Sequence, residues 1–364
     1  MRLIFAGGGS GGPVTPMLAV AEQIKKIQPN AEITFVGTKA GPERELVLAE
    51  GFAFESIPAA KLRRYFSLKN IVDVFVFAAG LFKAYQLVRR LKPDVIFSVG
   101  GFVAVPLCWV GKLMKIKIVI HQQDARPGLA NKLVSPMADV VTTALEETAK
   151  RFFTHAGFLK GESPKKIEWV GNPVRKDFFD DSIPHKNFFK LHDNLPVLLV
   201  TGGGTGAKQI NNVVEAALPN LVKAHQIVHI TGRGKNSIKF SHPDYHAYEF
   251  LGPEMPTILK MADMVICRAG LSTISELAIL GKISILVPMP NSHQEENGIL
   301  LKKRGAAVVL IKDEFTPENL ILVVNSLKFN VKRRESLKKN ISLLMPKDAA
   351  EKLAQIIIKA YGIK

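Results

Sequence analysis

Cysteine is nearly absent from the sequence. Its 364 residues include only Cys108 and Cys267, both inside apolar stretches, so neither a disulfide framework nor a clustered cysteine metal site is indicated. A secretory signal is also lacking, because the chain enters the apolar segment MRLIFA at once, without a preceding basic stretch. We therefore expect a protein of the reducing cytoplasm.

Acidic residues are the minority among the charged ones. The 49 Lys and Arg residues exceed the 32 Asp and Glu residues, which gives a formal net charge of +17. Such an excess predicts an acidic partner, which could be nucleic acid, an anionic lipid surface or a phosphorylated substrate. The sequence has no zinc-finger spacing, no aromatic RNA-binding motif and no basic zipper, so we expect no nucleic acid and favour a membrane or a phosphate.

A strand, a glycine-rich loop and a helix occur twice in the chain. The first set reads MRLIFA, GGGSGG (Gly7 to Gly12) and PVTPMLAVAEQIKKI, and the second reads PVLLVT, GGGTGA (Gly202 to Ala207) and QINNVVEAALPNLV. Strand-like and helix-like segments alternate after each set, which indicates a doubly wound parallel sheet in each half. The predicted fold class is α/β, with two Rossmann-like domains facing a central cleft.

The chain is longer than the roughly 250 to 300 residues at which a single core stops growing, which also favours two domains. A segment rich in charges, aromatics and prolines between Val174 and Pro196 is interpreted as the linker. We assign residues 1–174 to an N-terminal domain and residues 175–346 to a C-terminal domain. A last helix, at about residues 347–364, has an apolar stripe and is expected to pack back on the N-terminal domain.

Glycine loops that open a helix suit phosphate oxygens, because their N–H groups lie beside the positive end of the helix dipole. The strands ITFVGT and IVHITG do not end in the acid that holds the ribose of NAD or FAD, and neither loop continues as a nucleoside-triphosphatase motif. A third glycine segment, GGFVAVP (Gly100 to Pro106), follows another predicted strand. These loops predict a nucleotide diphosphate carrying another group, and more than one diphosphate in all.

The glycine loops and the phrases around them resemble the MurG family, the peptidoglycan transferases of glycosyltransferase family 28. The matching phrases are GGGSGGPVTPMLAVA, GGFVAVP, HQQDARPGLANK, VGNPVR, GGGTGA, CRAGLSTISELAILGKISILVPMP and HQEENG followed by GAA, and they span nearly the whole chain. The resemblance implies a GT-B fold and an inverting hexosyltransferase. Such an enzyme moves N-acetylglucosamine from UDP-GlcNAc to the undecaprenyl-diphosphate-linked N-acetylmuramyl-pentapeptide, converting lipid I to lipid II.

This reaction belongs to peptidoglycan synthesis, and hence to cell wall biogenesis, cell shape and cell division. By resemblance, the enzyme would work as a peripheral protein at the cytoplasmic face of the cell membrane. No D-x-D motif is present, so we expect no metal. UDP-GlcNAc is the substrate, and we expect no cofactor.

On the donor side, the resemblance implies a role for each matching residue. Arg175 would approach the donor from the hinge, Glu276 would hold the ribose hydroxyls, the backbone near Leu251 would bind uracil, and Gln294 would bind the sugar hydroxyls. The predicted donor-binding residues are Ser10, Gly11, Gly12, Asp124, Arg175, Gly203, Gly204, Thr205, Leu251, Leu271, Ser272, Thr273, Ile274, Ser275, Glu276 and Gln294. Two alternatives stay open: Arg175 as a surface charge of the linker, and Glu276 as a first-turn residue that complements a helix dipole.

On the acceptor side, the resemblance implies the first glycine loop, the GGFVAVP segment and the HQQD segment. The predicted acceptor-binding residues are Gly9, Gly11, Gly12, Gly100, Gly101 and Gln123. The chain departs from the family pattern here, because Pro13 replaces a histidine and HQQD replaces HEQN, with Gln122 for glutamate and Asp124 for asparagine. The candidate catalytic bases are Asp124 and His121, and the alternative for His121 is a buried histidine that orients the loop. A site that has lost activity is a further alternative.

A basic and aromatic stretch, residues 61–90, is predicted to touch an anionic membrane. Its uninterrupted apolar run, Val74 to Phe82, is far shorter than the roughly 20 residues that a spanning helix needs. We expect Phe75, Phe77, Leu81 and Phe82 to enter the lipid while Arg63, Arg64 and Lys69 meet anionic headgroups. The alternative is an internal helix of the first domain.

Two rival enzyme functions fit the same motifs. A related GT-B transferase would glycosylate diacylglycerol or another lipid, and a UDP-GlcNAc 2-epimerase would use the same donor without any acceptor. The basic and aromatic stretch argues against the epimerase.

Overall fold

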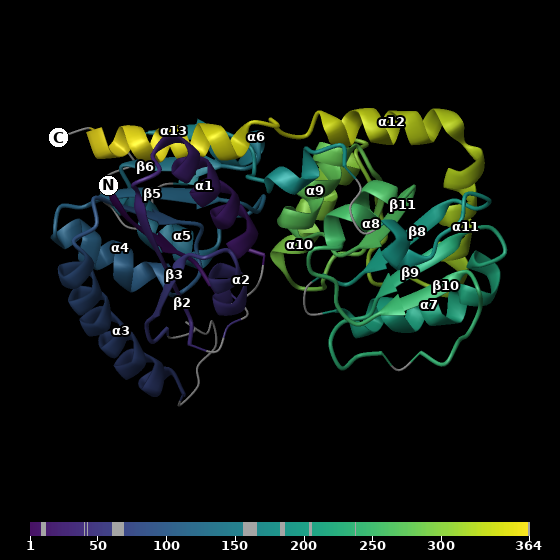
Figure 1. Cartoon of the computed structure of the whole chain (residues 1–364), viewed down its shortest axis with the longest axis horizontal. Helices are drawn as coiled ribbons and strands as arrows, with labels where there is room; N and C mark the ends of the chain where they lie inside the picture. The colour runs from purple at the N-terminus through teal and green to yellow at the C-terminus, as the bar shows by residue number, and fades with distance from the viewer. Residues whose placement is uncertain are drawn as a thin grey trace. The chain divides into compact units, whose positions relative to one another are not determined.

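A computed structural model describes residues 1–8, 12–39, 41, 43–59, 69–155, 166–182, 186–203, 206–236 and 238–362. The chain forms two compact units (Figure 1). The N-terminal unit contains Met1–Arg175 and Pro346–Lys364, and the C-terminal unit contains Lys176–Met345. Arg175, which we placed at the start of the second domain, thus groups with the first unit.

The N-terminal unit is built on a seven-stranded parallel sheet with the order β3-β2-β1-β4-β5-β6-β7. The strands are β1 Arg2–Ala6, β2 Glu32–Gly37, β3 Ala53–Ser56, β4 Val95–Ser98, β5 Lys117–Gln122, β6 Val140–Thr143 and β7 Ile167–Trp169. The order reverses between β1 and β4, and ligands of such sheets bind beside the carboxyl ends of strands at this switch point. The first and third glycine segments follow these two strands.

Helices cover both faces of this sheet, which explains why its central strands β1 and β4 are almost entirely buried. They are α1 Val14–Ile27, α2 Glu43–Ala49, α3 Lys69–Leu91, α4 Ala104–Leu113, α5 Leu129–Val134, α6 Glu146–His155 and α13 Ala349–Gly362, with a 3-10 turn, η1, at Ser135–Met137. One face buries Phe5 and Phe97 with α1 and α13, and the other buries Ile96 with α3 and α4. The last helix therefore lies beside the first (Figure 1).

The C-terminal unit is built on a six-stranded parallel sheet with the order β10-β9-β8-β11-β12-β13. The strands are β8 Val197–Thr201, β9 Gln226–Ile230, β10 Tyr245–Tyr248, β11 Met264–Cys267, β12 Ile283–Leu286 and β13 Val308–Val309. The helices are α7 Lys208–Leu221, α8 Met255–Met261, α9 Leu271–Leu280, α10 His293–Lys303, α11 Pro317–Phe329 and α12 Val331–Ser342, with 3-10 turns η2 at Lys176–Phe178 and η3 at Lys186–Phe189. Its switch point lies between β8 and β11.

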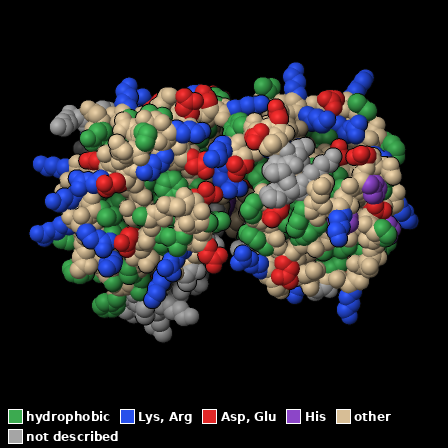
Figure 2. Space-filling view, viewed as in Figure 1, with side chains coloured by type: hydrophobic (Ala, Val, Ile, Leu, Met, Phe, Trp, Pro, Cys, Tyr) green, Lys and Arg blue, Asp and Glu red, His purple; other side chains and the backbone are tan. Residues whose placement is uncertain are grey.

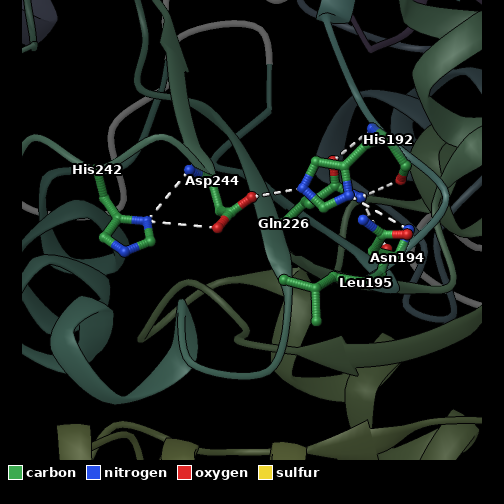
Figure 3. A network of polar contacts seen from close by, with 6 residues as sticks. All are labelled: His192, Asn194, Leu195, Gln226, His242 and Asp244. Carbon is green, nitrogen blue, oxygen red and sulfur yellow. Dashed lines mark hydrogen bonds and ion pairs between the residues drawn. The ribbon is translucent and has the colours of Figure 1, made fainter.

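A polar network fastens the segment that leads into β8 (Figure 3). The buried Gln226 accepts from the His192 N–H at 2.8 Å and donates to the carbonyls of His192 and Leu195 at 2.6 and 2.7 Å. The His192 ring contacts Asp244 at 2.8 Å, and Asp244 donates its own N–H to His242. His192 and Leu195 precede β8, Gln226 begins β9, and His242 and Asp244 precede β10, so the network stabilises the end of the sheet opposite the glycine loop.

Candidate functional site

The second glycine loop is a tight turn that only glycine can form at several positions. A Cβ added to Gly202 would lie 2.2 Å from the backbone nitrogen of Ala207, and one added to Gly206 would lie 2.4 Å from the carbonyl oxygen of Thr231. Gly203 and Gly206 have φ angles of +83° and +68°, which side chains disfavour. The Gly206 N–H donates to Gly203 O at 2.8 Å and closes the turn. The loop therefore presents bare backbone directly before α7.

Helices at this switch point start without a side-chain cap. α7 starts after Ala207 and α9 after Gly270, whereas Ser292, Thr316 and Asn330 cap α10, α11 and α12 with side-chain hydrogen bonds. In the N-terminal unit, α1 and α4 also begin without a side-chain cap. Uncapped first-turn N–H groups at the carboxyl edge of a parallel sheet suit an anionic ligand.

The start of α9 lies close to Gln294. A Cβ added to Gly270 would be 4.0 Å from Gln294 Nε2, while Gln294 Oε1 accepts the N–H of Met289 at 3.1 Å. Ser275 is buried and donates its hydroxyl to Leu271 O at 2.6 Å, so its side chain holds the helix together. Within this unit, the structure thus brings α9 and Gln294 to one place.

The side chains at the start of α9 divide into two groups. Leu271, Ile274 and Ser275 are buried, whereas Ser272, Thr273 and Glu276 are partly exposed. Glu276 is the sixth residue of α9, and the first turn of this helix contains no acid. The alternative in which Glu276 complements the dipole of the first turn is therefore wrong, because the helix begins earlier than that alternative requires.

In the N-terminal unit, the first and third glycine segments touch each other. A Cβ added to Gly101 would lie 2.8 Å from Gly8 O, and one added to Gly100 would lie 3.0 Å from Asn131 Oδ1. Both residues have positive φ angles, of +98° at Gly100 and +85° at Gly101. The prediction for Gly12 falls at the start of α1, directly before Pro13, which occupies the N-cap position.

Five of the predicted residues lie outside the described part of the chain. They are Gly9, Ser10 and Gly11 of the first glycine loop and Gly204 and Thr205 of the second.

His121 is fully buried at the end of β5. Its Nδ1 lies 3.0 Å from Thr142 Oγ1 and its Nε2 lies 3.2 Å from Asn172 Oδ1. Both ring nitrogens thus face a buried polar side chain, and the Thr142 hydroxyl itself donates to Ile120 O at 3.1 Å. Burial lowers the pKa of His121 to about 4, so the ring is neutral at pH 7. This geometry ties β5 to the GNPVR segment.

The departure from the family pattern at Gln122 has a structural consequence. The buried Gln122 donates its amide to the carbonyls of Asp124 and Arg126 at 2.9 and 3.2 Å, and accepts from Asn131 at 2.7 Å. An ionised glutamate could accept from Asn131 but could not donate to these carbonyls. Gln123 is buried beside it, and Asp124 is partly exposed. Gln122 thus fixes the loop that carries Asp124.

Both halves of the chain match known domains. Residues 3–143 match the glycosyltransferase family 28 N-terminal domain, and residues 197–353 match the glycosyltransferase family 28 C-terminal domain. A relative from Clostridium perfringens, named UDP-N-acetylglucosamine–N-acetylmuramyl-(pentapeptide) pyrophosphoryl-undecaprenol N-acetylglucosamine transferase, is 34% identical over 99% of this chain and 98% of its own. The chain belongs to glycosyltransferase family 28.

Solved structures agree with this membership. The crystal structure of MurG from Acinetobacter baumannii superposes with a TM-score of 0.71 at 25% identity, over 98% of this chain and 99% of that one. A UDP-GlcNAc 2-epimerase from Neisseria meningitidis bound to UDP-GlcNAc gives a TM-score of 0.73 at 13% identity, over 99% of this chain and 100% of that one, which reflects the fold alone. The predicted GT-B fold, with two parallel-sheet units, is confirmed.

Two cationic residues beside the second glycine loop escaped the sequence analysis. Arg268 follows β11 and donates to the carbonyls of Val287 and Pro288, both at 3.1 Å, and to Gln209 of α7 at 3.2 Å. Lys235 donates its ammonium to Gly206 O at 3.3 Å. Arg268 lies in the matching segment CRAG, directly after a strand at the switch point, and this position could have identified it from the sequence. Nothing in the sequence links Lys235 to Gly206.

An arginine and a phenylalanine meet near Leu251. The Arg233 guanidinium lies 4.4 Å from the centroid of the Phe250 ring, which is 42% exposed. The loops after β9 and β10 are joined here, because Gly234 N–H donates to the Glu249 carboxylate at 3.1 Å. Leu251 follows directly and is buried. The backbone predicted to recognise uracil therefore lies next to an exposed pair of an arginine and a phenylalanine.

Arg175 contacts an acid of its own unit. Its Nη1 lies 3.7 Å from Glu50 Oε1, and its side chain is 22% exposed. Asn172 of the same segment binds His121, as described above. The donor contact of Arg175 stays a prediction.

The outer surface of α3 exposes several large apolar side chains. Val74, Phe75 and Phe82 are 66%, 71% and 64% exposed, whereas Phe77 and Leu81 pack partly against the core. α3 is thus a helix of the first unit that packs on α4 and the core through one face, and contact of its outer face with a membrane stays a prediction. Arg63 and Arg64 lie outside the described residues, as does the side chain of Lys69.

Lys and Arg side chains project from both units on the face shown in Figure 2. In the part of the chain that the structure describes, no helix is long and apolar enough to cross a bilayer. Over the same residues, no group of His, Cys, Asp and Glu side chains could hold a metal ion.

Proposed function

We propose that this chain transfers N-acetylglucosamine from UDP-GlcNAc to the undecaprenyl-diphosphate-linked N-acetylmuramyl-pentapeptide, converting lipid I to lipid II in peptidoglycan synthesis. Membership of the family over both halves and the name of the Clostridium perfringens relative support this. The observation that carries it is the switch point of the C-terminal unit. A turn that requires glycine at several positions lies there, together with the starts of α7 and α9, which have no side-chain cap, and Gln294 lies near the start of α9. This arrangement suits a diphosphate attached to a sugar.

The C-terminal unit holds the donor in this proposal. The diphosphate lies on Gly203 to Thr205 and on the start of α7, with Arg268 and Lys235 adding positive charge nearby. Glu276 binds the ribose hydroxyls, Gln294 the sugar hydroxyls, and the backbone near Leu251 the uracil. Ser10, Gly11, Gly12, Asp124 and Arg175 complete the donor contacts from the N-terminal unit.

The N-terminal unit holds the acceptor, through Gly9, Gly11, Gly12, Gly100, Gly101 and Gln123. Asp124 is the base that we carry forward, because it is partly exposed on a braced loop, whereas both ring nitrogens of His121 are engaged inside the core. The acceptor hydroxyl attacks C1 of the sugar, its proton passes to the Asp124 carboxylate, and the bond from C1 to the diphosphate oxygen breaks.

The leaving UDP needs positive electrostatics in place of protonation. Uncapped helix starts, glycine-loop N–H groups and the nearby cations meet that need in our proposal. We therefore propose a metal-independent reaction without a further cofactor, as the absence of a D-x-D motif predicts.

We further propose that the chain is a peripheral protein of the cytoplasmic face of the cell membrane. The exposed apolar side chains of α3 and the basic stretch before it would contact anionic lipid, since apolar side chains flanked by cations suit the bilayer interface. A measurement of binding to liposomes tests this. Loss of binding in Phe75→Ser/Phe82→Ser supports it, and equal binding to neutral and anionic vesicles contradicts it.

The transfer itself is tested with UDP-GlcNAc and a short-chain lipid-linked muramyl acceptor. The proposal predicts a disaccharide product and release of UDP that depends on the acceptor. Transfer to diacylglycerol but not to the muramyl acceptor would favour a glycolipid synthase. Conversion of UDP-GlcNAc to its 2-epimer without acceptor would favour the epimerase.

A further inference from the structure

A buried carboxylate lies beside Gly8, at the start of the first glycine loop. Glu43, the first residue of α2, is 1% exposed. Its Oε1 accepts two hydrogen bonds from Thr38, from the backbone N–H at 2.8 Å and from the hydroxyl at 2.6 Å. Removing a carboxylate from water is costly, so fixed donors such as these are what a buried carboxylate requires. The proposed reaction does not use Glu43.

Three glycines pack around this carboxylate. An added Cβ would lie 1.9 Å from Glu43 Oε2 at Gly41, 2.8 Å from Glu43 Cγ at Gly37 and 2.6 Å from Glu43 Oε1 at Gly8. Real Cβ atoms do not approach other heavy atoms within 3.0 Å. Gly37 ends β2 and Gly41 lies between β2 and α2, but Gly8 belongs to the first glycine loop. The carboxylate therefore joins that loop to the connection after β2.

Gly8 has a second neighbour in the third glycine segment. As described above, a Cβ on Gly101 would lie 2.8 Å from Gly8 O, and it would lie 3.3 Å from Gly8 N. A Cβ on Gly8 would also lie 3.4 Å from Gly37 Cα, so the Glu43 carboxylate and the backbones of Gly37 and Gly101 leave little space around Gly8. Of these three neighbours, only Glu43 contributes a side chain.

We propose that Glu43 is a positioning residue for the first glycine loop. Its carboxylate, fixed by Thr38, determines the position of Gly8. The residues predicted to contact the substrates follow directly in the sequence, at Gly9 to Gly12. This inference rests on the proposed function, because it assigns the effect of Glu43 to the transfer reaction. Misplacing a catalytic group by about 1 Å can cost about 10²-fold in rate, so a fixed loop base matters.

Steady-state kinetics of Glu43→Ala and Glu43→Gln test the role. We expect Glu43→Ala to lower kcat for transfer by about 10²-fold, because the loop base moves. Glu43→Gln keeps the shape and an oxygen that can accept from Thr38, so it should stay within about tenfold of the parent. Calorimetric binding of UDP should fall far less than kcat in both variants, because the proposal assigns most of the donor contacts to the C-terminal unit.

The matched control is Glu45→Ala, an exposed acid on the same helix, which should stay within about twofold of the parent. If Glu43→Ala weakens UDP binding as strongly as it lowers kcat, the effect is general and the positioning role is wrong. Parent-like kinetics of Glu43→Ala also overturn it.

A double-mutant cycle tests the contact with Gly8. The only atoms that a Cβ on Gly8 would meet under 3.4 Å belong to the Glu43 side chain. Glu43→Ala removes them, so Gly8→Ala/Glu43→Ala should be no worse than Glu43→Ala alone, within about threefold. Fully additive losses would show that the two residues do not interact and would refute the proposal.

Hydrogen exchange of the Gly7 and Gly8 amides provides a readout that needs no substrate. In Glu43→Ala these amides should exchange at least about tenfold faster than in the parent, while the β1 amides stay unchanged. If the parent shows no transfer, the proposed function fails and the exchange still decides the role of Glu43. Unchanged exchange at Gly7 and Gly8 overturns the positioning role by itself.

Discussion

The two units share a plan but hold their first glycine loops by different means. In the C-terminal unit, Gly206 packs against the backbone of Thr231, where β9 ends. In the N-terminal unit, Gly8 packs against the side chain of Glu43. A contact between two backbones does not depend on the identity of any neighbouring side chain, whereas the contact at Gly8 depends on one residue. The second loop is therefore the more robust of the two.

Each unit also buries a neutral histidine. His121 in β5 and His229 in β9 are fully buried, and the Nε2 of each lies 3.2 Å from an asparagine Oδ1, of Asn172 and Asn211 respectively. Asn211 belongs to α7 and also donates to Thr231 O at 3.0 Å, so His229 fixes the donor-side helix. His121 instead fixes the segment that leaves the N-terminal unit. A buried histidine paired with an asparagine therefore stabilises α7 in the C-terminal unit and the segment that contains Asn172 in the N-terminal unit.

The largest expected effect is the loss of kcat on substitution of Asp124, which lies in the N-terminal unit that we propose to bind the acceptor. Asp124→Asn should lower kcat by about 10³-fold, because an amide cannot take the hydroxyl proton, and should weaken UDP binding far less, because most of the proposed donor contacts lie in the C-terminal unit. Transfer assays with the lipid-linked acceptor measure this. The control is Asp193→Asn, an exposed acid of the C-terminal unit. Turnover near that of the parent would remove Asp124 as the base.

The buried histidines predict a dependence of stability on pH. Burial lowers the pKa of His121 and of His229 from 6.5 to about 4, so the unfolded chain binds protons that the folded chain does not. The contribution is therefore complete above about pH 6.5 and is lost as the pH falls toward 4, by roughly 3 kcal/mol for each histidine. Urea unfolding at several pH values measures this slope.

The two units can be followed separately in that experiment. Both tryptophans, Trp109 and Trp169, lie in the N-terminal unit, so their fluorescence reports its unfolding. The slope of the free energy of unfolding against pH measures how many protons the chain takes up on unfolding. In His121→Asn, the slope measured by fluorescence should correspond to about one proton fewer. In His229→Asn, it should be unchanged. The same flattening in both variants would show that the units unfold together.

Gly206→Ala sharpens the comparison of the loops. An added Cβ meets the backbone of Thr231 and Gly232, and the φ angle of +68° disfavours a side chain, so UDP affinity should fall by about 10²-fold. Calorimetry measures the loss, with Gly362→Ala, where a Cβ meets nothing, as the control. No second side-chain substitution should restore binding, in contrast to Gly8→Ala. If a second substitution at a neighbouring side chain restored UDP binding to Gly206→Ala, the proposed difference between the two glycine loops would be wrong.

The smallest expected effect is at Gln122. Gln122→Glu removes two donated hydrogen bonds to loop carbonyls, so the free energy of unfolding should fall by about 1 to 3 kcal/mol. Tryptophan fluorescence in urea measures it, and Gln86→Glu on the exposed side of α3 serves as the control. An unchanged stability would mean that the loop does not depend on this amide.

Patterns local in sequence predicted the fold, and contacts between distant segments were missed. The alternation of strands and helices indicates two parallel sheets, because each unit repeats a short pattern along the chain. Glu43, by contrast, acts on Gly8 from the far side of α1 and β2 in the sequence. Lys235 reaches Gly206 from the exit of β9 in the same way. Such contacts follow from strand order and side-chain length, which no local pattern contains.

The candidate site shows the same limit. The glycines at positions 202, 203 and 206 were predictable, because tight turns before helices need glycine. The burial of His121 was not, since a histidine at a strand end reads alike whether it faces solvent or the core. Its alternatives could be weighed only once Thr142 and Asn172 were seen against its ring.

The return of α13 to α1 has a consequence for how the molecule is made. Leu353, Ala354 and Ile357 lie in the same core as Val20 and Ile24, so the first helix to leave the ribosome is covered by the last. During synthesis, the C-terminal unit can complete its core while the N-terminal unit still waits for its final helix. A nascent chain that stopped at residue 345 would leave an apolar surface on α1 open to chaperones, although every predicted site residue had already been translated.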